Sequence, residues 1–417
     1  MSPRRREQWS WALYDWANSA FATTVLAGFF PIFFARYWAN GLPPGERTWW
    51  LGIAGSVSSM VVMVLAPVLG GIADRRGLKK RFLAVATVLG ASSTAAMYWV
   101  AQGQWQQALA LFGLASVGFF AALAFYDSLL VGVAETDEMD RVSALGYGAG
   151  YLGGGLLFAL NVAMFQSPAT FGIPDGEQAI LLSFLMVGLW WVFFSVPLFR
   201  YVRESAAPDQ AGSDWAQLRK TFGKALNTQP IWMFLLAYWL YIDGVDTIIR
   251  MAVDYGIKLG FEPGALIKAL LLVQFVGFPA AIAFGWLADR FGTRALIYVA
   301  LAVYVAVTFW AYTLQTESQF YLMAAVIALV QGGVQSLSRS FFAKLIPPGE
   351  SGQFFGLYNM IGKFAAVLGP LALGYTAAAF PDNQRLSVLA LLPFFIVGGL
   401  LLARVRVPAP ARKSPQR

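Results

Sequence analysis

Four ionisable residues lie close together in an apolar stretch, where a membrane would exclude water. Asp243, Asp246, Arg250 and Asp254 follow one another at intervals of three, four and four residues, which puts them on one face of a helix. A charge at the bilayer centre costs about 2.5–3.5 kcal/mol on insertion scales, so such groups are usually paired or functional. We expect this face to line a central cavity, with Asp243 binding substrate or a proton. For Asp246 and Arg250, the alternative is an internal ion pair that only holds the helix.

A second polar set, near the start of the chain, repeats this spacing. Asp15 and Asn18 are three residues apart, like the first two carboxylates of the first set. Each pair has a tyrosine beside it, Tyr14 in one case and Tyr241 in the other. If the two segments are repeat mates, we expect these side chains to face one another across the cavity. The alternative for Asp15 is a solvated position near a helix start.

Further polar residues interrupt other apolar stretches. Asp127 and Arg339 are expected near the cytoplasmic ends of two helices, as a charge gate or as a local structural pair. Lys363 lies well inside an apolar stretch and needs a counter-charge or an anionic ligand there. Gln331 and Gln335 are one helical turn apart. We expect these last three residues to line the cavity.

The composition excludes several kinds of chemistry. The chain has no cysteine and no histidine, so disulfides, thiolate nucleophiles and the commonest general base are absent. It also contains no phosphate-binding loop, zinc-ligand spacing or nucleophile triad. We therefore expect neither an enzyme nor a cofactor-dependent or metal-dependent protein, and any proton handling must fall on carboxylates.

The elements that position these residues must be membrane-spanning helices. Of the 417 residues, 58% are hydrophobic and 12% charged, against roughly 25% charged in soluble domains. Runs such as 49–73 and 265–288 are long enough to cross a bilayer, which takes about 20 residues. About twelve spans are predicted, near residues 9–37, 49–73, 82–101, 105–131, 142–165, 178–198, 229–255, 265–288, 294–314, 318–343, 353–378 and 386–405.

The distribution of Lys and Arg predicts the orientation of these spans. Most of the cations fall in loops on one side, at 4–6, 75–81, 200–224, 290–294 and from 404 onward. By the positive-inside rule, both termini are then cytoplasmic and the number of spans is even. The net charge of +8 is thus a topology signal, and we expect no nucleic-acid partner. Short loops and the lack of an organelle signal favour a bacterial inner membrane.

The longest hydrophilic stretch divides the chain into two halves. We predict a first six-helix bundle over residues 1–199, a cytoplasmic linker over 200–228, a second bundle over 229–405 and a tail over 406–417. Within the linker, Trp215, Leu218, Phe222 and Leu226 recur at helical spacing among cations. This pattern is typical of an amphipathic helix on the membrane surface.

An internal repeat supports the division. Residues 70–77 read GGIADRRG and residues 285–292 read GWLADRFG, each directly after the second span of its half. The first glycine allows two helices to approach closely, and the last permits a tight turn. The aspartates, Asp74 and Asp289, can cap a helix or pair with an arginine across the two halves. Such contacts would latch the cytoplasmic side shut.

With this repeated string, the chain resembles the major facilitator superfamily over essentially its whole length. Three further strings, YDWANS at residues 14–19, FYDS at 125–128 with RVS at 141–143, and YIDGV at 241–245, resemble the vacuole-effluxer-like branch of fungal autophagy-associated amino-acid effluxers. The resemblance implies an all-α membrane fold of two pseudo-symmetric six-helix bundles. It also implies a secondary transporter that exports amino acids or similar small solutes by alternating access.

We therefore expect a monomer in the lipid bilayer that binds a small-molecule substrate, with protons as one choice of coupling ion. The expected gating residues are Asp74, Arg75, Asp289, Arg290, Asp127, Arg141 and Arg339. One alternative keeps the fold but changes the cargo to an amphipathic molecule such as a drug or a lysolipid. Another is a membrane receptor or scaffold without transport, with the linker as its signalling surface.

Overall fold

Long helices make up nearly all of the chain. The computed structural model describes residues 2–204, 223–258, 262–347, 349–380, 383 and 385–406, and no strand occurs in these ranges. Eleven helical stretches within them are long and apolar enough to cross a membrane. A further long helix, α13 (Ser351–Ala379), has 29 residues. The predicted amphipathic helix of the linker lies mostly outside the described residues.

The first half begins with a helix whose winding changes along its length. Its parts are α1 (Pro3–Ala20), the π-helix η1 (Phe21–Phe29), α2 (Phe30–Phe33) and the π-helix η2 (Phe34–Trp38). The remaining elements are α3 (Pro44–Arg76), α4 (Lys79–Ala96), η3 (Met97–Trp99), α5 (Trp105–Val133), α6 (Met139–Gln166), η4 (Pro168–Phe171) and α7 (Gly176–Tyr201). Because π-helical turns are often found at functional sites, η1 marks this helix as one of interest.

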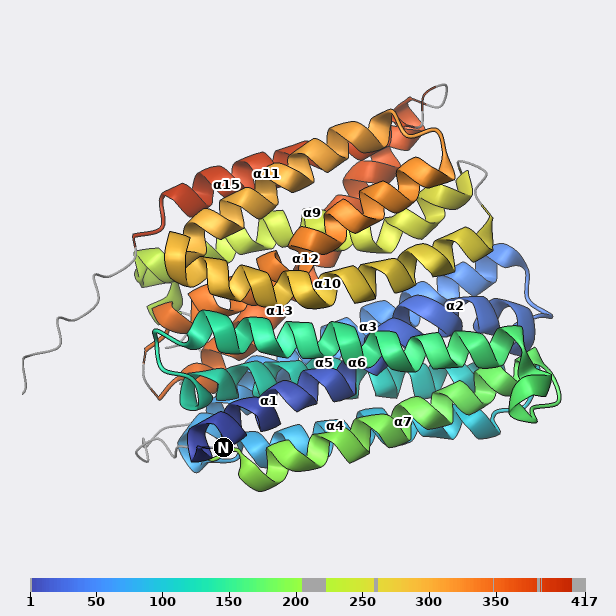
Figure 1. The fold of residues 1–417 in the computed structure, drawn as a ribbon, viewed down its shortest axis with the longest axis horizontal. Helices are drawn as coiled ribbons and strands as arrows, with labels where there is room; N and C mark the ends of the chain where they lie inside the picture. Colours follow the sequence, from blue (N-terminus) through green and yellow to red (C-terminus); the bar gives the residue numbers. More distant parts are fainter. Residues whose placement is uncertain are drawn as a thin grey trace, which may run out of the picture.

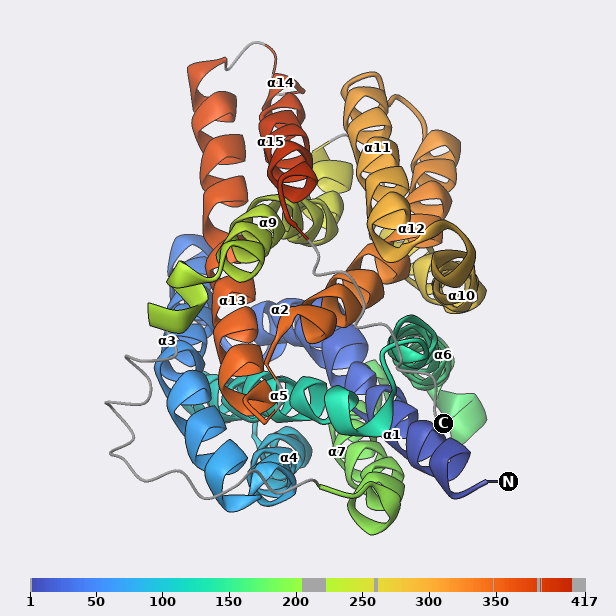
Figure 2. The same ribbon diagram turned by 90° about the vertical axis from the view of Figure 1, so that its left-hand side faces the viewer.

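The second half contains the other group of long helices. They are α9 (Gln229–Lys258), α10 (Pro263–Phe291), α11 (Thr293–Tyr312), α12 (Glu317–Leu345), α13, α14 (Leu386–Leu389) and α15 (Leu392–Ala403). In Figure 1, α1–α7 gather in the lower part of the molecule and α9–α15 mostly in the upper part. The last turns of α12 and the first turns of α13 reach down to the first group, as Figure 2 shows.

Both groups share one end that is rich in cations. The N-terminus, the end of α7 and the end of α15 all lie at the left of Figure 1, which faces the viewer in Figure 2. The turn between α3 and α4, with Arg75, Arg76 and Lys79, also belongs to this end. We call it the basic end and the opposite one the distal end.

Sequence-encoded caps and turns set several helix boundaries. The side chains of Ser2, Asp175 and Thr316 accept hydrogen bonds from backbone N–H groups in the first turns of α1, α7 and α12, as N-caps do. The repeated string ends each time in a glycine with positive φ, Gly77 at 61° and Gly292 at 89°. Non-glycine residues are strained there, so the glycine that closes each copy has a structural reason.

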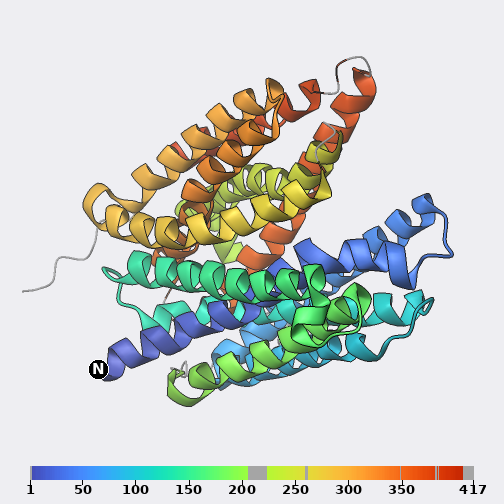
Figure 3. The same ribbon diagram turned by 45° about the vertical axis from the view of Figure 1, so that its right-hand side comes forward.

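The halves meet chiefly along two helix pairs, and also where α12 contacts α6 and α13 contacts α5. α6 packs along α10, and α3 packs along α13. A Cβ atom on Gly70 would lie 2.2 Å from the carbonyl oxygen of Gly352, and one on Gly285 would lie 2.5 Å from Cβ of Ala144. Close approach of backbones through small residues is how helices associate in lipid. Towards the distal end, α3 and α13 separate, as Figure 3 shows.

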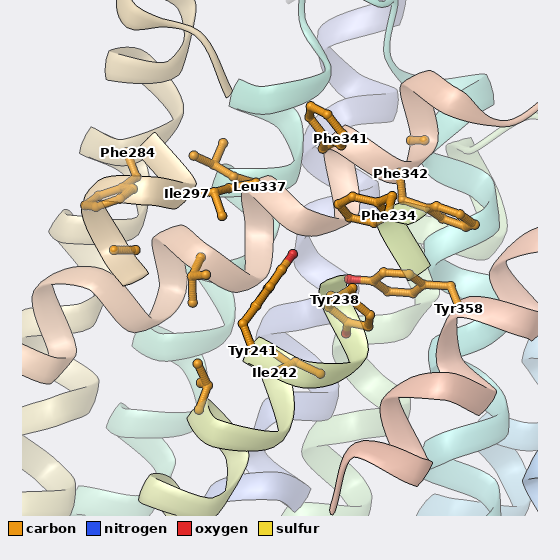
Figure 4. Packing of buried hydrophobic residues seen from close by; sticks show 14 of the residues in the cluster. Phe234, Tyr238, Tyr241, Ile242, Phe284, Ile297, Leu337, Phe341, Phe342 and Tyr358 are labelled. Atoms are coloured by element: carbon orange, nitrogen blue, oxygen red, sulfur yellow. The ribbon is translucent and has the colours of Figure 1, made fainter. Parts of the chain in front are cut away.

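Aromatic rings fill the second half between α9, α12 and α13. Tyr238 stacks on Tyr358 with ring centroids 4.2 Å apart, and Phe342 stacks on the other side at 5.0 Å. Figure 4 shows these rings beside Phe234 and Tyr241. Stacked rings of this kind contribute about 0.5–1.5 kcal/mol beyond the area they bury. This packing holds α9, α12 and α13 of the second half together.

We expect Gly118→Ala to destabilise the first half. A Cβ atom at Gly118 would lie 2.5 Å from the backbone nitrogen of Gly90, so α5 and α4 would have to separate, at a cost of about 1–3 kcal/mol. The control is Gly113→Ala on the same helix, because that Cβ would meet only Ser58 Oγ at 3.6 Å. Thermal unfolding in detergent should show a lower midpoint for the first variant alone. Equal midpoints would contradict the packing described.

Candidate functional site

A buried arginine from the second half is enclosed by residues of the first. Arg339, on α12, is 2% exposed. Its guanidinium lies 3.0 Å from Asp127 on α5 and 3.3 Å from Asp15 on α1. Its Nε donates to Ser143 Oγ at 2.9 Å, and another guanidinium nitrogen donates to the Ser143 carbonyl at 2.8 Å. We call Asp15, Asp127, Ser143 and Arg339 the ion cluster.

Other side chains fix the two carboxylates in place. The hydroxyl of Tyr126 donates to Asp15 at 2.8 Å, and the amide of Asn359 on α13 donates to Asp127 at 3.0 Å. The ion cluster therefore ties α1, α5 and α6 of one half to α12 and α13 of the other. The sequence left a charge gate and a local structural pair as the options for Asp127 and Arg339, and the two side chains are in contact across the halves.

Aromatic rings cover the faces of the guanidinium. The arginine carbon Cζ lies 4.8 Å from the ring of Trp11, 5.5 Å from that of Tyr126 and 4.5 Å from that of Tyr147. A desolvated cation over a ring gains about 2 kcal/mol. The rings also exclude water, which strengthens the attraction between Arg339 and its carboxylates.

The four residues of the ion cluster carry more negative than positive charge. They contain one guanidinium and two carboxylates, both nearly buried. Because burial of an unpaired charge is expensive, a further positive charge near the two carboxylates would stabilise the cluster. Lys363 is one turn beyond Asn359 on α13, but its side chain lies outside the described residues.

The first copy of the repeated string forms a contact between the halves at the basic end. Asp74 accepts hydrogen bonds from the backbone N–H groups of Gly352 at 2.8 Å and Gln353 at 2.9 Å. Lys79 Nζ lies 2.8 Å from Asp74 and donates to Ser351 Oγ at 2.8 Å. Asp74 thus caps the N-terminus of α13, where a carboxylate is stabilising. We call these five residues the latch.

The second copy makes its contact through side chains. Asp289 forms an ion pair with Arg141 at the start of α6. Next to it, Asp140 accepts from Lys344 Nζ at 2.6 Å and from Thr293 Oγ1 at 2.7 Å. The sequence left capping and ion pairing as alternatives for the two aspartates, and each copy uses one of them. Arg75 and Arg290 lie at the basic end beside these contacts.

Asp243 lies within the second half. It is 1% exposed, and its carboxylate accepts from the backbone N–H groups of Leu368 at 3.1 Å and Gly369 at 2.9 Å. These N–H groups directly precede Pro370, which cannot continue a helical hydrogen-bond pattern. Asp243 therefore binds the interior of α13, a partner that sequence spacing did not suggest. Asp246, three residues on, is partly buried.

The other predicted residues are distributed over both halves. Tyr14 shares a 2.7 Å hydrogen bond with Thr87, and Tyr241 shares one with Ser338. Asn18 is 1% exposed, and its Nδ2 has no hydrogen-bond partner in the described part. On α12, Gln331 is buried and Gln335 is partly buried. The side chains of Arg250 and Asp254 lie outside the described residues.

Sequence reasoning missed several members of the site. Asn359, Ser143, Tyr126 and Trp11 all touch the ion cluster, and none was singled out for it. A signal existed for two of them, since Tyr126 and Ser143 stand in the strings around residues 125–128 and 141–143. Asn359 is an ordinary polar residue in sequence, and only the packing of α13 against α5 gives it a partner.

Comparisons with known proteins agree on family and fold. The family model described as "Vacuole effluxer Atg22 like" matches residues 52–413. The "Uncharacterized MFS-type transporter YxiO" of Bacillus subtilis is 36% identical over 406 residues, which cover 96% of this chain and 95% of that protein. The "Autophagy-related protein 22-1" of Penicillium rubens is 27% identical over 293 residues, covering 63% of this chain and 48% of its own length.

Solved structures match the fold at low identity. The human organic anion transporter MFSD10 superposes with a TM-score of 0.73 at 15% identity, over 96% of this chain and all of that one. The proton:xylose symporter XylE gives 0.73 at 13% identity, over 97% and 95%. The expected all-α fold of the major facilitator superfamily is therefore confirmed.

We expect Arg339→Met to cost about 3–5 kcal/mol, because it leaves two buried carboxylates without their cation. The double variant Asp127→Asn with Arg339→Met should recover part of this loss, since one of the stranded charges is removed as well. Unfolding midpoints of the two single variants, the double variant and the parent complete a double-mutant cycle. Additive losses would contradict a direct interaction between Asp127 and Arg339.

We also expect Gly70→Ala to hold the basic end open, because its Cβ would collide with the backbone of Gly352. The chain has no native cysteine, so Ser351→Cys provides a single thiol within the latch, and every variant compared carries it. Its maleimide labelling rate should rise roughly ten-fold. An overpacking cost of about 1–3 kcal/mol would shift the equilibrium from closed to open molecules by about that factor. In the control, Gly55→Ala, the Cβ would meet nothing within 4 Å and the rate should stay unchanged. An unchanged rate in Gly70→Ala would disprove tight closure at this point.

Proposed function

The chain belongs to the vacuole effluxer Atg22-like family of secondary transporters, and we propose that it exports amino acids or related small solutes by alternating access. Family membership confirms that the protein is a multi-pass membrane transporter of a small-molecule substrate and not an enzyme. The cargo, the direction of transport and the coupling ion are the proposed parts.

The ion cluster is the observation that carries this proposal. Alternating access needs contacts between the halves that can form in one state and break in another. Arg339 makes such a contact, since its two carboxylates and its serine all belong to the opposite half. When the halves separate, these charged groups return to water. Their hydration then offsets part of the energy lost with the contact. A cluster that held only one half together would lack this property.

We propose that the substrate binds in the centre between the halves, near the helices that carry the cluster. Asp243, Asp246 and Tyr241 would act from α9, and Asp15, Asn18 and Tyr14 from α1. Gln331 and Gln335 of α12 would supply neutral hydrogen bonds, while Arg250 and Lys363 would set the positive charge of the cavity. A zwitterionic amino acid offers one carboxylate and one ammonium group, which suits a site with both kinds of charge.

Protons are the coupling ion that we propose. The ion cluster holds two carboxylates for one described cation, and a proton would remove the excess negative charge. Asp15, which contacts both Arg339 and Tyr126, is in a position to change partners when it is protonated. Asp127, Arg141 and Arg339 would then act with the two aspartates of the repeated string as gating residues.

We propose that the basic end faces the cytoplasm, by the positive-inside rule. The structure would then represent a carrier closed to the cytoplasm by the latch and by the pair Asp289–Arg141. Both termini would be cytoplasmic, and the protein would work as a monomer. Export would require this end to open, load the cargo and close again.

A second cargo class is favoured by one observation. The interface helices carry many aromatic side chains, including Tyr147 over Arg339 and the stacked pair Tyr238 and Tyr358. Such rings would suit an amphipathic molecule, for example a drug or a lysolipid. In that case, the ion cluster would serve gating and coupling only.

The test is transport by purified protein in proteoliposomes. We expect one class among amino acids, peptides and lysolipids to move with an imposed pH gradient. We expect Asp15→Asn to lose the coupling between cargo and gradient, and Asp243→Asn to lose cargo transport. The control is Asp137→Asn, because that exposed carboxylate lies in the loop between α5 and α6. Movement of lysolipids alone would favour the second cargo class. If no solute of any class moves, or if Asp243→Asn matches the parent, the proposed site is wrong.

A further inference from the structure

A carboxylate just beyond α7 supports the latch without belonging to it. Glu204 accepts hydrogen bonds from the backbone N–H groups of Lys79 at 2.6 Å and Lys80 at 3.2 Å. These are the first two residues of α4. An anion that binds the free N–H groups of a helix start fixes the first turn. Glu204 is the cap that α4 otherwise lacks, since its own N-cap residue, Leu78, makes no side-chain hydrogen bond.

Lys79 is the residue that links this cap to the latch. Its backbone N–H is held by Glu204, while its side chain lies 2.8 Å from Asp74 and donates to Ser351 of the other half at 2.8 Å. The side chain is nearly buried, with 10% exposed. A lysine that bridges two partners in a nearly dry contact has to start from a backbone position that lets its ammonium reach both.

The second half provides an internal comparison. In both halves a cation at the start of one helix donates to the carbonyl of a valine just beyond another helix. Lys80 of α4 donates to Val202 after α7, and Arg294 of α11 donates to Val405 after α15. This anchor is therefore a feature of the repeated fold. The residues that follow the two valines are Arg203-Glu204 and Arg406-Val407, so the carboxylate is present in the first half alone.

The same asymmetry appears in the contacts that the two copies make across the interface. In the first half, the turn between α3 and α4 reaches across through Lys79 and Asp74 to the start of α13. In the second half, Asp289 pairs with the side chain of Arg141, and the N-cap residue of α11 is Gly292, which has no side chain. The carboxylate thus accompanies a lysine bridge that starts from the repeated turn itself, whereas on the other side the lysine that contacts Asp140 and Thr293 is Lys344 of α12.

We propose that Glu204 is a positioning residue of the gate: it fixes the first turn of α4 so that Lys79 can join Asp74 to Ser351 and hold the basic end closed. This inference rests on the proposed role of the latch in alternating access, but not on any cargo or coupling ion. Glu204 acts within its own half, so its loss changes the closure between the halves only through Lys79.

The test measures closure directly. Because the chain has no native cysteine, Arg76→Cys and Phe291→Cys give two spin labels at exposed positions on the basic ends of α3 and α10. Pulsed dipolar spectroscopy of the full chain in nanodiscs then gives the populations of short and long distances. We expect Glu204→Ala to raise the ratio of open to closed molecules roughly two- to thirty-fold, which corresponds to the 0.5–2 kcal/mol by which residues that act through a network modulate coupling.

Two further variants separate positioning from general loss of stability. Glu204→Gln keeps an oxygen that can accept from the backbone, and we expect it to restore much of the closed population. Asp175→Ala removes the N-cap of α7, where Asp175 accepts from Gln178 at 2.8 Å, and should lower the unfolding midpoint without changing the distances. Lys79→Met should open the basic end as far as Glu204→Ala does, and the two changes together should add little.

The outcomes also separate this inference from the proposed function. Unchanged distances in Glu204→Ala, with Lys79→Met opened, would overturn the positioning role and leave the carrier proposal intact. An equal shift in Asp175→Ala would overturn it as well, because any lost cap would then suffice. A shift in Glu204→Ala and Lys79→Met alone supports it, whatever cargo the transport assays find.

Discussion

The burial of one guanidinium with two carboxylates between the halves is the constraint on which the rest of the structure depends. Arg339 is held from α1, α5 and α6, and it reaches them only when α12 lies against the first half. Such a cluster adds little net stability, since desolvation offsets most of the attraction. Its effect is specificity: the halves have one arrangement in which all of these groups have partners, and a partial separation would leave charges in a dry environment.

The packing around the cluster follows from this constraint. For Arg339 to reach Asp15, α6 must approach closely, and Gly146 allows it: a Cβ there would lie 2.6 Å from Asp15 and 3.0 Å from Arg339. At the basic end, Gly70 and Gly352 bring α3 and α13 into backbone contact, so that Asp74 can cap α13. Small residues in this chain therefore permit specific polar contacts between helices, in addition to the close packing that lipid favours.

Much of this organisation was predictable from the sequence. The hydropathy pattern predicted the helices, and the repeated string predicted both the close approach at Gly70 and Gly285 and the two roles open to Asp74 and Asp289. The partners of Asp243 were not predictable. Helical spacing says which residues share a face, but Asp243 binds backbone N–H groups of α13, and backbone groups carry no sequence signal. Asn359 was missed for a related reason, since its importance comes from a neighbour that is distant in sequence.

The two halves carry the same repeated string, yet they close the basic end in different ways, and the difference has a physical consequence. The contact of Asp74 is buried and uses backbone N–H groups, whereas Arg141, the partner of Asp289, is 60% exposed. Exposed pairs are screened by salt and contribute little, while a buried cap with a lysine bridge forms only at close approach. The α10 side has a buried contact as well, since Asp140 accepts from Lys344 and Thr293 of the other half, so only the Asp289–Arg141 pair tolerates small displacements. An opening motion of the basic end would therefore lose the exposed Asp289–Arg141 pair at little cost and meet its main barrier at the buried contacts of Asp74 and Asp140.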